Sequence, residues 1–494
     1  MKVLVTIASY GAGNDPYLER VIAEYRSMAH DHDVDIVVLS NIPKEAPPGV
    51  EVVVGLPTSD PWSLPFAHKR VLADRVDRYD LFIYSENDIL ITGKNIEAFL
   101  WATTLLRENE VAGFLRTELG PDGHKYYPDV NKMYHWDPQS VVQRGNHIFA
   151  FFTCEHAACF ILTRQQLQRA IDSGGFLVEP HEGKYDLACT AATDPYTQCG
   201  LKKMICVSDL DKFLVSHLSN KYIGTDYDLE EGDFDRQIEA LIDVHEGKRS
   251  RAHLLNTETS FPLLKSSKSY YEPLRREILE LIPAEVKSVL SVGCGWGVME
   301  ECLVQRGTPV VAVPLDSVIS ACAEARGIRT VSPDFETAWK ELANLHFDCV
   351  LVSNILHLAP DPPAILRECA GCLADEGRIV LIVPNFNYLK VLWRRICRTP
   401  GYRNLGNYDE AGVNLTTHRL IQGWLTHCGL VMDRVIEGVP ERAKALSRLR
   451  VATPYLASEV TVSCRKKTSR AGQTIIGQFS GVQRQPETQL TATE

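Results

Sequence analysis

The amino-acid sequence predicts an α/β protein of two different domains, and three observations carry this prediction. Strand-like apolar runs alternate with helix-like segments from Val3 to about Ile223, and the alternation returns from Val289 to about Cys464. The stretch between them, EGKRSRAHLLNTETSFPLLKSSKS, is polar, basic and Ser-rich, as is typical of a domain junction. A chain of 494 residues is also too long for one hydrophobic core. We therefore expect the following division of the chain: a first domain at 1–250, a linker at 251–268, a second domain at 269–466 and a disordered tail at 467–494, where Gln, Thr, Ser and Gly dominate.

Composition and charge exclude several classes of protein. A net charge of −11 argues against a nucleic-acid partner, because phosphate-binding surfaces usually show as an excess of Lys and Arg. The start, MKVLVTIASYG, resembles a first buried strand and not a signal peptide, and no apolar stretch approaches the roughly 20 residues that cross a bilayer. We therefore predict a cytoplasmic protein without an integral membrane segment. Fourteen cysteines without regular spacing suit reduced thiols, and the close pair Cys369 and Cys372 fits core packing better than zinc.

A glycine turn opens the second domain. The apolar run SVLSV leads directly into Gly293, Gly295 and Gly297, and a helix-forming stretch follows. Glycines at such a turn let the backbone bend sharply and approach a ligand closely, which indicates a nucleoside-type ligand. The dinucleotide pattern GxGxxG is not met, because Val298 stands where its third glycine belongs. NAD is therefore the weaker choice.

The segments after this turn carry a resemblance. TPVVAVPLDS, VSPDFET and FDCVLVSNILHLAPDPPAILRECAGCLADEGRIVLIVPN resemble, in order and spacing, small-molecule methyltransferases related to the quinone-biosynthesis enzymes. With the glycine turn the likeness spans about Tyr270 to Asn387, and TTHRLIQGWLTHCGLVMDRV looks like the family's final helix and strand hairpin. The resemblance implies a Rossmann-like class I methyltransferase domain that uses S-adenosylmethionine. By position, it assigns the methionine part of the donor to Gly293, Cys294, Gly295 and Gly297, the adenine to Asp334 and Phe335, and the region of the methyl group to Asn354.

Two positions depart from the family's pattern. The acidic residue common before the glycine turn is Ser291, and the ribose-binding carboxylate at the end of the second strand is replaced by Pro314. Asp316, two residues further on, is the candidate substitute. A proline cannot accept the two ribose hydroxyl hydrogen bonds, and such a loss weakens binding by about 1–3 kcal/mol. The alternative interpretation is a methyltransferase fold that no longer catalyses and acts as a binding or scaffolding module for its neighbour.

The first domain begins as a nucleotide-binding half fold. VLVTIASYGAGNDPYLERVIAEYRSM predicts a buried strand, a Gly and Asn turn and an amphipathic helix, and VDIVVLSN predicts a second strand. Further on, the strand DLFIYSENDILIT runs into Glu86 and Asp88, which would lie on the same side of an extended chain. Two such carboxylates suit an oxygen-ligated divalent ion. The alternative is a solvated strand end that caps the next helix.

This segment resembles the DxD region of GT-A glycosyltransferases, with Glu in place of the first Asp. The likeness spans about Met1 to Tyr222 and includes CEHAACFILTRQQLQRAI, YDLACTAATDPYTQCGLKKMI and FLVSHLSNKY. It implies a nucleotide-sugar donor and a Mn²⁺ or Mg²⁺ ion held by Glu86, Asp88 and His217, although a lone His is as often an ordinary core or surface residue. A carboxylate must also take the acceptor's proton in an inverting enzyme. The candidates for this catalytic base are Glu182, Asp186 and Asp194.

Together these resemblances predict a bifunctional transferase that acts on a small-molecule or glycan acceptor, in the synthesis of a methylated surface polysaccharide or glycolipid. The alternative is a single active transferase whose other domain, the methyltransferase by preference, is non-catalytic. The segment YLKVLWRRICRTPGYR is basic and amphipathic, which leaves room for peripheral membrane contact. The competing interpretation is a surface helix whose Leu392 and Trp393 pack on the domain.

Overall fold

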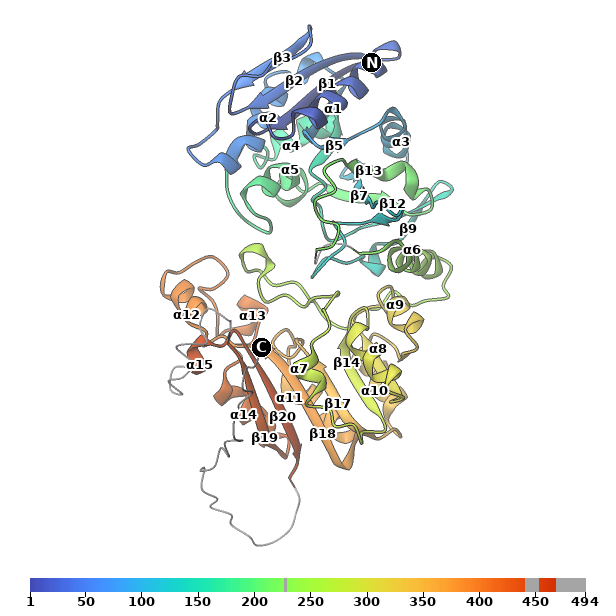
Figure 1. Cartoon of the computed structure of the whole chain (residues 1–494), viewed down its shortest axis with the longest axis vertical. Coiled ribbons are helices and arrows are strands. Elements are labelled where there is room, and N and C mark those ends of the chain that lie inside the picture. Colours follow the sequence, from blue (N-terminus) through green and yellow to red (C-terminus); the bar gives the residue numbers. More distant parts are fainter. Residues whose placement is uncertain (226–228, 440–452, 468–494) are drawn as a thin grey trace, which may run out of the picture.

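The computed structural model describes residues 1–225, 229–439 and 453–467. Figure 1 shows two α/β parts along the long axis of the molecule, the N-terminal part in blue to green and the C-terminal part in yellow to red. Within the described residues, no helix is both long and apolar enough to cross a membrane. The predicted disordered tail lies, from residue 468 on, outside the described residues.

A five-stranded sheet in the order β11-β4-β1-β2-β3 forms the centre of the N-terminal part. Neighbouring strands are parallel except β11, which runs antiparallel to β4. Its strands are β1 (Lys2–Ser9), β2 (Asp33–Ser40), β3 (Val50–Val54), β4 (Leu81–Glu86) and β11 (Cys159–Thr163). β1 and β4 are almost wholly buried because both faces of a parallel sheet are covered. Their carboxyl ends meet at one edge, where open α/β sheets bind ligands.

Helices of this part bury apolar stripes against the sheets. α1 (Asp15–Ser27) shows the principle, because its buried residues Leu18, Val21, Ile22 and Tyr25 recur every three or four positions. The remaining helices are α2 (Ala67–Ala73), α3 (Gly93–Thr103), α4 (Arg164–Asp172), α5 (Leu187–Thr197) and α6 (Glu231–His245), with the 3₁₀ helices η1 (Met28–His30), η2 (Pro61–Phe66), η3 (Val76–Arg78), η4 (Pro138–Ser140) and η5 (Leu210–Phe213).

Two smaller sheets, β6-β12-β10-β9 and β5-β13-β7-β8, complete this part. Their strands are β5 (Ile89–Leu90), β6 (Glu110–Ala112), β7 (Leu115–Leu119), β8 (Lys125–Tyr126), β9 (Val142–Arg144), β10 (His147–Ala150), β12 (Lys202–Cys206) and β13 (Leu214–His217). β13 pairs with β5 so that His217 lies opposite Ile89. This register brings His217 next to Asp88 from far along the chain.

One expectation about the acidic pair is corrected. β4 ends at Glu86, and Asn87 and Asp88 form a turn before β5. Strand alternation therefore does not place Glu86 and Asp88 on one side of an extended chain. The turn and the pairing with β13 position Asp88 instead.

The C-terminal part is a seven-stranded sheet in the order β16-β15-β14-β17-β18-β20-β19. β16 to β18 are parallel, while β20 and β19 form an antiparallel hairpin at the edge, as expected. Its strands are β14 (Val289–Cys294), β15 (Val310–Pro314), β16 (Arg329–Thr330), β17 (Phe347–Ser353), β18 (Leu373–Pro384), β19 (Leu430–Gly438) and β20 (Glu459–Lys466). Its helices are α7 (Arg276–Leu279), α8 (Val298–Gln305), α9 (Ser320–Ala325), α10 (Phe335–Leu342), α11 (Pro362–Gly371), α12 (Leu389–Ile396), α13 (Tyr408–Ala411), α14 (His418–His427) and α15 (Thr453–Leu456).

The two parts are in direct contact. α6 packs on α9, and Arg326 makes two hydrogen bonds with the carboxylate of Asp233 at 2.6 and 2.9 Å. The connecting segment joins this interface, because His253 pairs with Asp316 in an isolated β-bridge. It also contributes buried side chains and the 3₁₀ helix η6 (Pro262–Leu264). The segment at 251–268 is therefore packed between the parts (Figure 1).

Candidate functional site

A buried cluster of acidic side chains around one histidine lies at the carboxyl end of β4. The Nε2 atom of His217 is 3.2 Å from Oδ2 of Asp88, and its Nδ1 atom is 2.5 Å from Oε1 of Glu118. Burial alone would lower the pKa of His217, but the hydrogen bonds to Asp88 and Glu118 outweigh it and raise the pKa. The histidine thus bridges two carboxylates that are each at most 2% exposed.

Glu86, the third residue expected to hold the metal, is half-buried beside this cluster. Burial, and then the negative charge of Asp88, raise its pKa to about 7. In the ranges that the structure describes, no group of three or more His, Cys, Asp and Glu side chains is arranged as a metal centre. The structure therefore brings Asp88 and His217 together directly, while Glu86 joins them through electrostatics.

A cavity of about 480 Å³ opens from Glu86 and Asp88. Asn14 donates a hydrogen bond to Asn87 at 3.1 Å, and Asn87 donates one to Ser9 at 2.9 Å, which fixes the loop after β1 against the turn after β4. Tyr10 and Trp62 line the cavity and are 54% and 66% exposed. Lys221 supplies a cation in the same wall. Two exposed aromatic rings, one cation and two carboxylates therefore surround one cavity.

A second cavity, of about 410 Å³, is found on the other side of the first turn of α5. Ala188 lines the first cavity, while Asp186 and Cys189 line the second. Asp186 is exposed and caps α5, because its Oδ1 accepts a hydrogen bond from the backbone of Cys189 at 2.9 Å. The wall also contains Lys184 and His156. Asp186 is thus the one candidate base that lines either of these two cavities, and it lines the second.

The structure removes Asp194 from the candidates for a catalytic base. It is fully buried in the last turns of α5, ion-paired with Lys69, and 3.3 Å from Nε2 of His181. A carboxylate that is enclosed in this way cannot contact an acceptor hydroxyl. Glu182 is exposed and lines neither of the two cavities.

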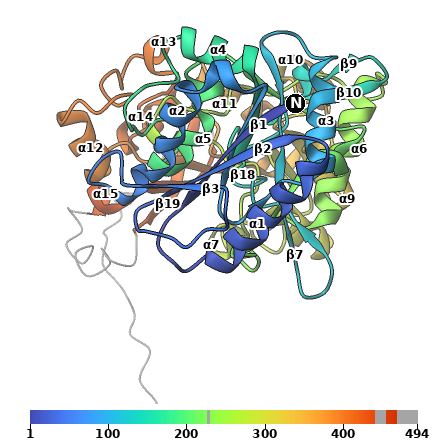
Figure 2. The same cartoon turned by 90° about the horizontal axis from the view of Figure 1, so that it is seen from above.

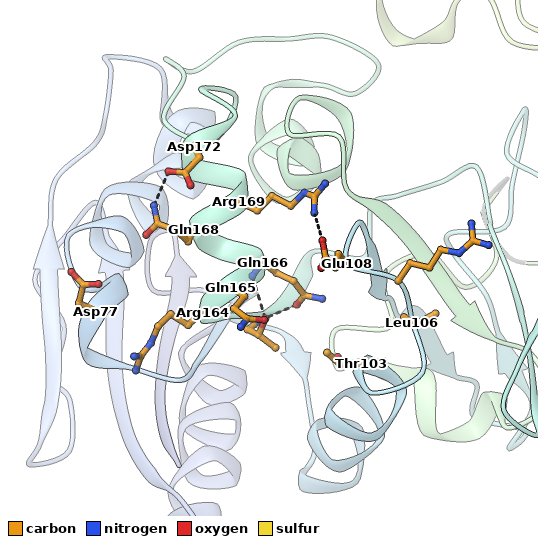
Figure 3. A pocket seen from close by; sticks show the side chains of 12 residues that line it. Asp77, Thr103, Leu106, Glu108, Arg164, Gln165, Gln166, Gln168, Arg169 and Asp172 are labelled. Carbon is orange, nitrogen blue, oxygen red and sulfur yellow. Dashed lines mark hydrogen bonds and ion pairs between the residues drawn. The ribbon is translucent and has the colours of Figure 1, made fainter.

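The largest cavity among those described, about 710 Å³, lies elsewhere, against α4 (Figure 3). Its side chains pair mainly with one another: Gln168 donates to Asp172 at 2.8 Å, and Arg169 is 3.6 Å from Glu108. No residue predicted for either site lines this cavity. The Arg169–Glu108 pair is solvent-exposed, and such pairs are weakly held. Size alone therefore does not identify the functional site.

The glycine turn of the C-terminal part has the predicted conformation. Gly293 and Gly297 adopt φ of +82° and +88°, a region that favours glycine, and Gly297 begins α8. A Cβ atom at Gly295 would lie 2.1 Å from the carbonyl oxygen of Tyr270. Cys294 is buried at the end of β14. Only glycine therefore fits at the middle of this turn.

The segment that contains Tyr270 covers the turn. The Tyr270 carbonyl accepts a hydrogen bond from the backbone of Trp296 at 2.9 Å, and burial, followed by the nearby carboxylate of Asp316, raises the pKa of the Tyr270 hydroxyl. Asp316 is 1% exposed and accepts hydrogen bonds from the backbones of Val318 and Ile319. Burial raises its pKa to about 7. In this arrangement the expected substitute for the ribose carboxylate is not open to a ligand.

A buried polar cluster forms at the carboxyl end of β17. Glu272 is 2.8 Å from Lys268, which is fully buried, and accepts hydrogen bonds from Ser353 at 2.8 Å and Asn354 at 3.2 Å. Burial alone would raise the pKa of Glu272, but Lys268 and these hydrogen bonds lower it. Asn354 has a φ of +50°, which is costly for a residue with a side chain. The buried charges beside this left-handed residue make the end of β17 a candidate functional site.

The other residues expected near the adenine lie at the start of α10. Asp334 caps that helix, with Oδ1 accepting from Thr337 at 2.9 Å, and Phe335 stacks on Trp339 with ring centres 5.8 Å apart. At the ribose position, β15 ends at Pro314. At the position before the glycine turn, Ser291 donates a hydrogen bond to Glu300 at 2.6 Å.

Sequence reasoning missed the residues that tertiary packing brings to the two candidate sites from other segments. Glu118 reaches His217 from β7, and Lys268 and Glu272 reach Asn354 from the segment before β14. No motif marks these residues, because their neighbours are set by tertiary packing. The buried pair Lys268 and Glu272, four positions apart in KSYYE, is the one available signal.

Comparisons with known proteins fall on the C-terminal part. The family model "Methyltransferase domain" matches residues 267–434. The chain is 32% identical over 209 residues to the ubiquinone biosynthesis O-methyltransferase of Xanthomonas axonopodis pv. citri, covering 38% of this chain and 82% of that protein. Its Xylella fastidiosa counterpart is 26% identical over 197 residues, covering 38% of this chain and 80% of that protein. A solved S-adenosylmethionine-dependent methyltransferase from Mesorhizobium loti aligns with 39% of this chain and 96% of its own, at 19% identity and a TM-score of 0.29.

Proposed function

Because the chain belongs to the class I S-adenosylmethionine-dependent methyltransferases through residues 267–434, we propose that it transfers a methyl group to a glycan or small-molecule hydroxyl and a sugar to the same kind of acceptor. The Xanthomonas and Xylella relatives named above are O-methyltransferases, which supports an oxygen acceptor. The methylated product would be a surface polysaccharide or glycolipid. The observation that supports methyl transfer best is the strained Asn354 beside the glycine turn.

The C-terminal residues fit one end of S-adenosylmethionine better than the other. The turn of Gly293, Gly295 and Gly297 would hold the methionine part through its backbone, and the Lys268–Glu272 pair beside Asn354 matches its opposite charges. Asp334 and Phe335 would flank the adenine. The bound cofactor would supply a sulfonium-activated methyl group. This chain's own residues would orient it and exclude water, because the site is buried.

The ribose end does not fit without movement. Pro314 has no side-chain acceptor, and the carboxylate of Asp316 is buried. This observation favours a second candidate function, in which the C-terminal part binds or supports its neighbour without catalysing transfer. Titration calorimetry with S-adenosylmethionine separates the two, since the scaffold predicts no saturable heat.

Sugar transfer is proposed for the N-terminal part from the paired cavities. The cavity beside Glu86 and Asp88 offers aromatic rings for a nucleoside and Lys221 for a diphosphate, while the cavity beyond Asp186 offers space for an acceptor. Asp186, which lines this second cavity, would take the proton of the acceptor hydroxyl. A screen of intact nucleotide sugars for hydrolysis and transfer tests this proposal. Absence of turnover with every donor, in the presence of Mn²⁺, would leave the cavities as binding sites only.

The donor set supports a divalent ion in this site. Asp88, Glu86 and Nε2 of His217 would hold it, and Glu118 would fix the imidazole through Nδ1. A carboxylate behind a metal-bound histidine is the usual supporting arrangement. His217 would exchange its contact with Asp88 for the ion. The ion's chemistry is stabilisation of negative charge on a leaving diphosphate.

A further inference from the structure

Helix α12, residues Leu389–Ile396, stands at the edge of the C-terminal part in both views (Figures 1 and 2). None of its residues is buried. Val391 packs against a small apolar cluster, made of Phe261, Leu358, Phe386, Tyr402, Leu405 and Val413. Arg394 donates a hydrogen bond to the hydroxyl of Tyr402 at 2.9 Å. The helix is therefore fixed to the molecule along one side only.

The opposite side of α12 is apolar and open. Leu389, Trp393 and Ile396 are 52%, 66% and 74% exposed. Their spacing of four and three positions puts them in one stripe, because a helix advances about 100° per residue. Val391 projects almost directly away from that stripe. The prediction that Trp393 packs on the domain is therefore wrong.

Basic side chains border this stripe on both sides. At about 100° per residue, the exposed Lys390 lies on one side of the stripe and the exposed Arg395 on the other, while Arg394 is turned toward Tyr402. The segment 388–398 contains four Lys and Arg residues and no Asp or Glu, in a chain whose net charge is −11. Lys265 lies close to this segment, because after burial the positive charges of Arg394 and Lys390 lower its pKa.

From this arrangement we propose that α12 is a membrane-surface helix that lies in the headgroup region of an anionic bilayer. Exposed Trp, Leu and Ile between cationic residues are the pattern of interfacial helices, in which the apolar stripe enters the bilayer boundary and the basic residues contact lipid phosphates. A second copy of this face is a poor partner, because it would bring cations against cations. A planar anionic surface satisfies both the stripe and its two basic borders.

The position of α12 relates this surface to the methyltransferase site. The helix follows β18 after four residues, and the last residue of β18, Pro384, pairs with Glu459, which is 3.5 Å from Asn354. On the bilayer, the carboxyl edge of the sheet would therefore be held near the lipid. An acceptor with a lipid anchor would suit this geometry, a consequence that rests on the proposed methyl transfer.

Flotation of the full chain with vesicles tests the helix without requiring either activity. We expect binding to vesicles of phosphatidylcholine with 30% phosphatidylglycerol and at least tenfold weaker binding to pure phosphatidylcholine. Two double variants, Trp393→Ser with Ile396→Ser and Lys390→Glu with Arg395→Glu, should each reduce binding to the anionic vesicles at least tenfold. All four side chains are exposed, so thermal stability should not fall.

Matched controls carry the same changes elsewhere on the surface. Leu177→Ser, at a side chain 53% exposed, and Arg306→Glu with Lys340→Glu, at exposed positions, should leave vesicle binding unchanged. Equal binding by the α12 variants and these controls would overturn the proposal. Two results together would also overturn it: the unmodified chain binds no vesicles, and the variant Trp393→Ser with Ile396→Ser changes its oligomeric state in sedimentation velocity. The stripe would then be a protein interface.

Discussion

The two candidate sites differ in how open they are. The acidic site at the end of β4 adjoins cavities of about 480 and 410 Å³, with Asp88 and Glu86 in one wall and Asp186 in the other. The glycine turn at the end of β14 is crossed by residues 268–272, whose Tyr270 carbonyl contacts the turn, and the nearby Asp316 is 1% exposed. The site with the family signature is the covered one, and the site with the weaker motif is accessible.

This difference separates two kinds of information in a sequence. Glycines at a turn reflect the backbone conformation that the turn requires, and this requirement is the same whether or not a ligand can enter the site. A cavity depends on distant side chains that pack around it. The glycine turn therefore identifies the fold of the C-terminal part, whereas access to its cofactor depends on Tyr270 and on the N-terminal residues behind it.

The largest effect is expected from a substitution that disrupts only the covered site at the glycine turn. In Gly295→Ala, the new Cβ would meet the Tyr270 carbonyl at 2.1 Å, so the covering segment or the turn must shift. We expect at least about 100-fold weaker binding of S-adenosylmethionine and a loss of about 1–3 kcal/mol in unfolding free energy from overpacking. Titration calorimetry and urea unfolding measure the two quantities.

The matched control for this change is Gly423→Ala. Gly423 lies in α14, and a Cβ added there would meet nothing within 4 Å, so alanine should stabilise the helix slightly. Nucleotide-sugar hydrolysis should be unchanged in both variants. Equal loss of hydrolysis and donor binding in Gly295→Ala would show that the two sites are not separate.

The second effect would break the open site alone. Asp88→Asn keeps the shape of the side chain but removes the charge that would hold a divalent ion. Binding of UDP in the presence of Mn²⁺ should weaken by about 2 kcal/mol, roughly thirtyfold. Asp211→Asn, at a carboxylate 89% exposed, is the control that should bind normally. Calorimetry with and without EDTA decides the matter, and binding that survives both EDTA and Asp88→Asn would contradict the metal assignment.

The third prediction uses the pH dependence of the covered site. Because the folded pKa of Asp316 is about 7, above its unfolded value, the folded state binds the proton more tightly. Its contribution to stability is therefore present at low pH and is lost as the pH rises from about 4 to about 7. Asp316→Asn should remove this loss, which is on the order of 2–4 kcal/mol. Urea unfolding at about pH 5 and pH 8 measures the difference.

Asp334→Asn serves as the control in the same domain. The backbone N–H of Thr337 lowers the pKa of Asp334, so its titration lies below this pH window. The pH dependence between about 5 and 8 should stay that of the unmodified protein. If Asp316→Asn also keeps that dependence, Asp316 is ionised and solvated at neutral pH, and the site is more open than the structure indicates.

Much of the fold followed from the sequence, since the strands and the glycine turn depend on local pattern. The strands around Val5, Ile83 and Val292 are apolar runs of strand length, and the hairpin of β19 and β20 closes the second sheet as expected. These features need only hydrophobic periodicity and glycine conformation. The α/β mixed architecture is confirmed, and the class I methyltransferase family is confirmed for the C-terminal part.

The accessibility of single side chains and their interaction partners could not be predicted from the sequence in the same way. Asp194 and Asp186 both lie in the short segment YDLACTAATD, yet one is fully buried on Lys69 and the other lines a cavity. Asp316 is the residue expected to reach a ribose, but it is buried close to Tyr270, which lies far back along the chain. In each case a residue far along the chain decides the environment. The roles of single residues therefore remain proposals, whereas the strands and turns could be predicted.

The cover over the glycine turn is held from the N-terminal part. The ring of His135 stacks on Tyr270 with centres 4.1 Å apart and planes 5° apart, and the backbone of Tyr270 donates to the Lys132 carbonyl at 2.6 Å. Burial lowers the pKa of His135 to about 4, so the ring is neutral and the stack persists across physiological pH. Lys132 also lines the second cavity. The open site and the covered site thus share one short segment.

The smallest effect is expected from weakening the contact between His135 and Tyr270, which links the two sites. His135→Ala removes the stack on Tyr270 and should lower the unfolding free energy by about 1 kcal/mol. Freed on one side, residues 268–272 should open more often, so the association rate of S-adenosylmethionine should rise severalfold in stopped-flow measurements, while UDP binding stays constant. His147→Ala is the matched control, because His147 packs edge-on against Trp101 at 4.2 Å within the N-terminal part and should cost similar stability without changing that rate. An unchanged rate in a His135→Ala variant that has lost the expected stability would mean that Tyr270 is a fixed wall of the site and not its cover.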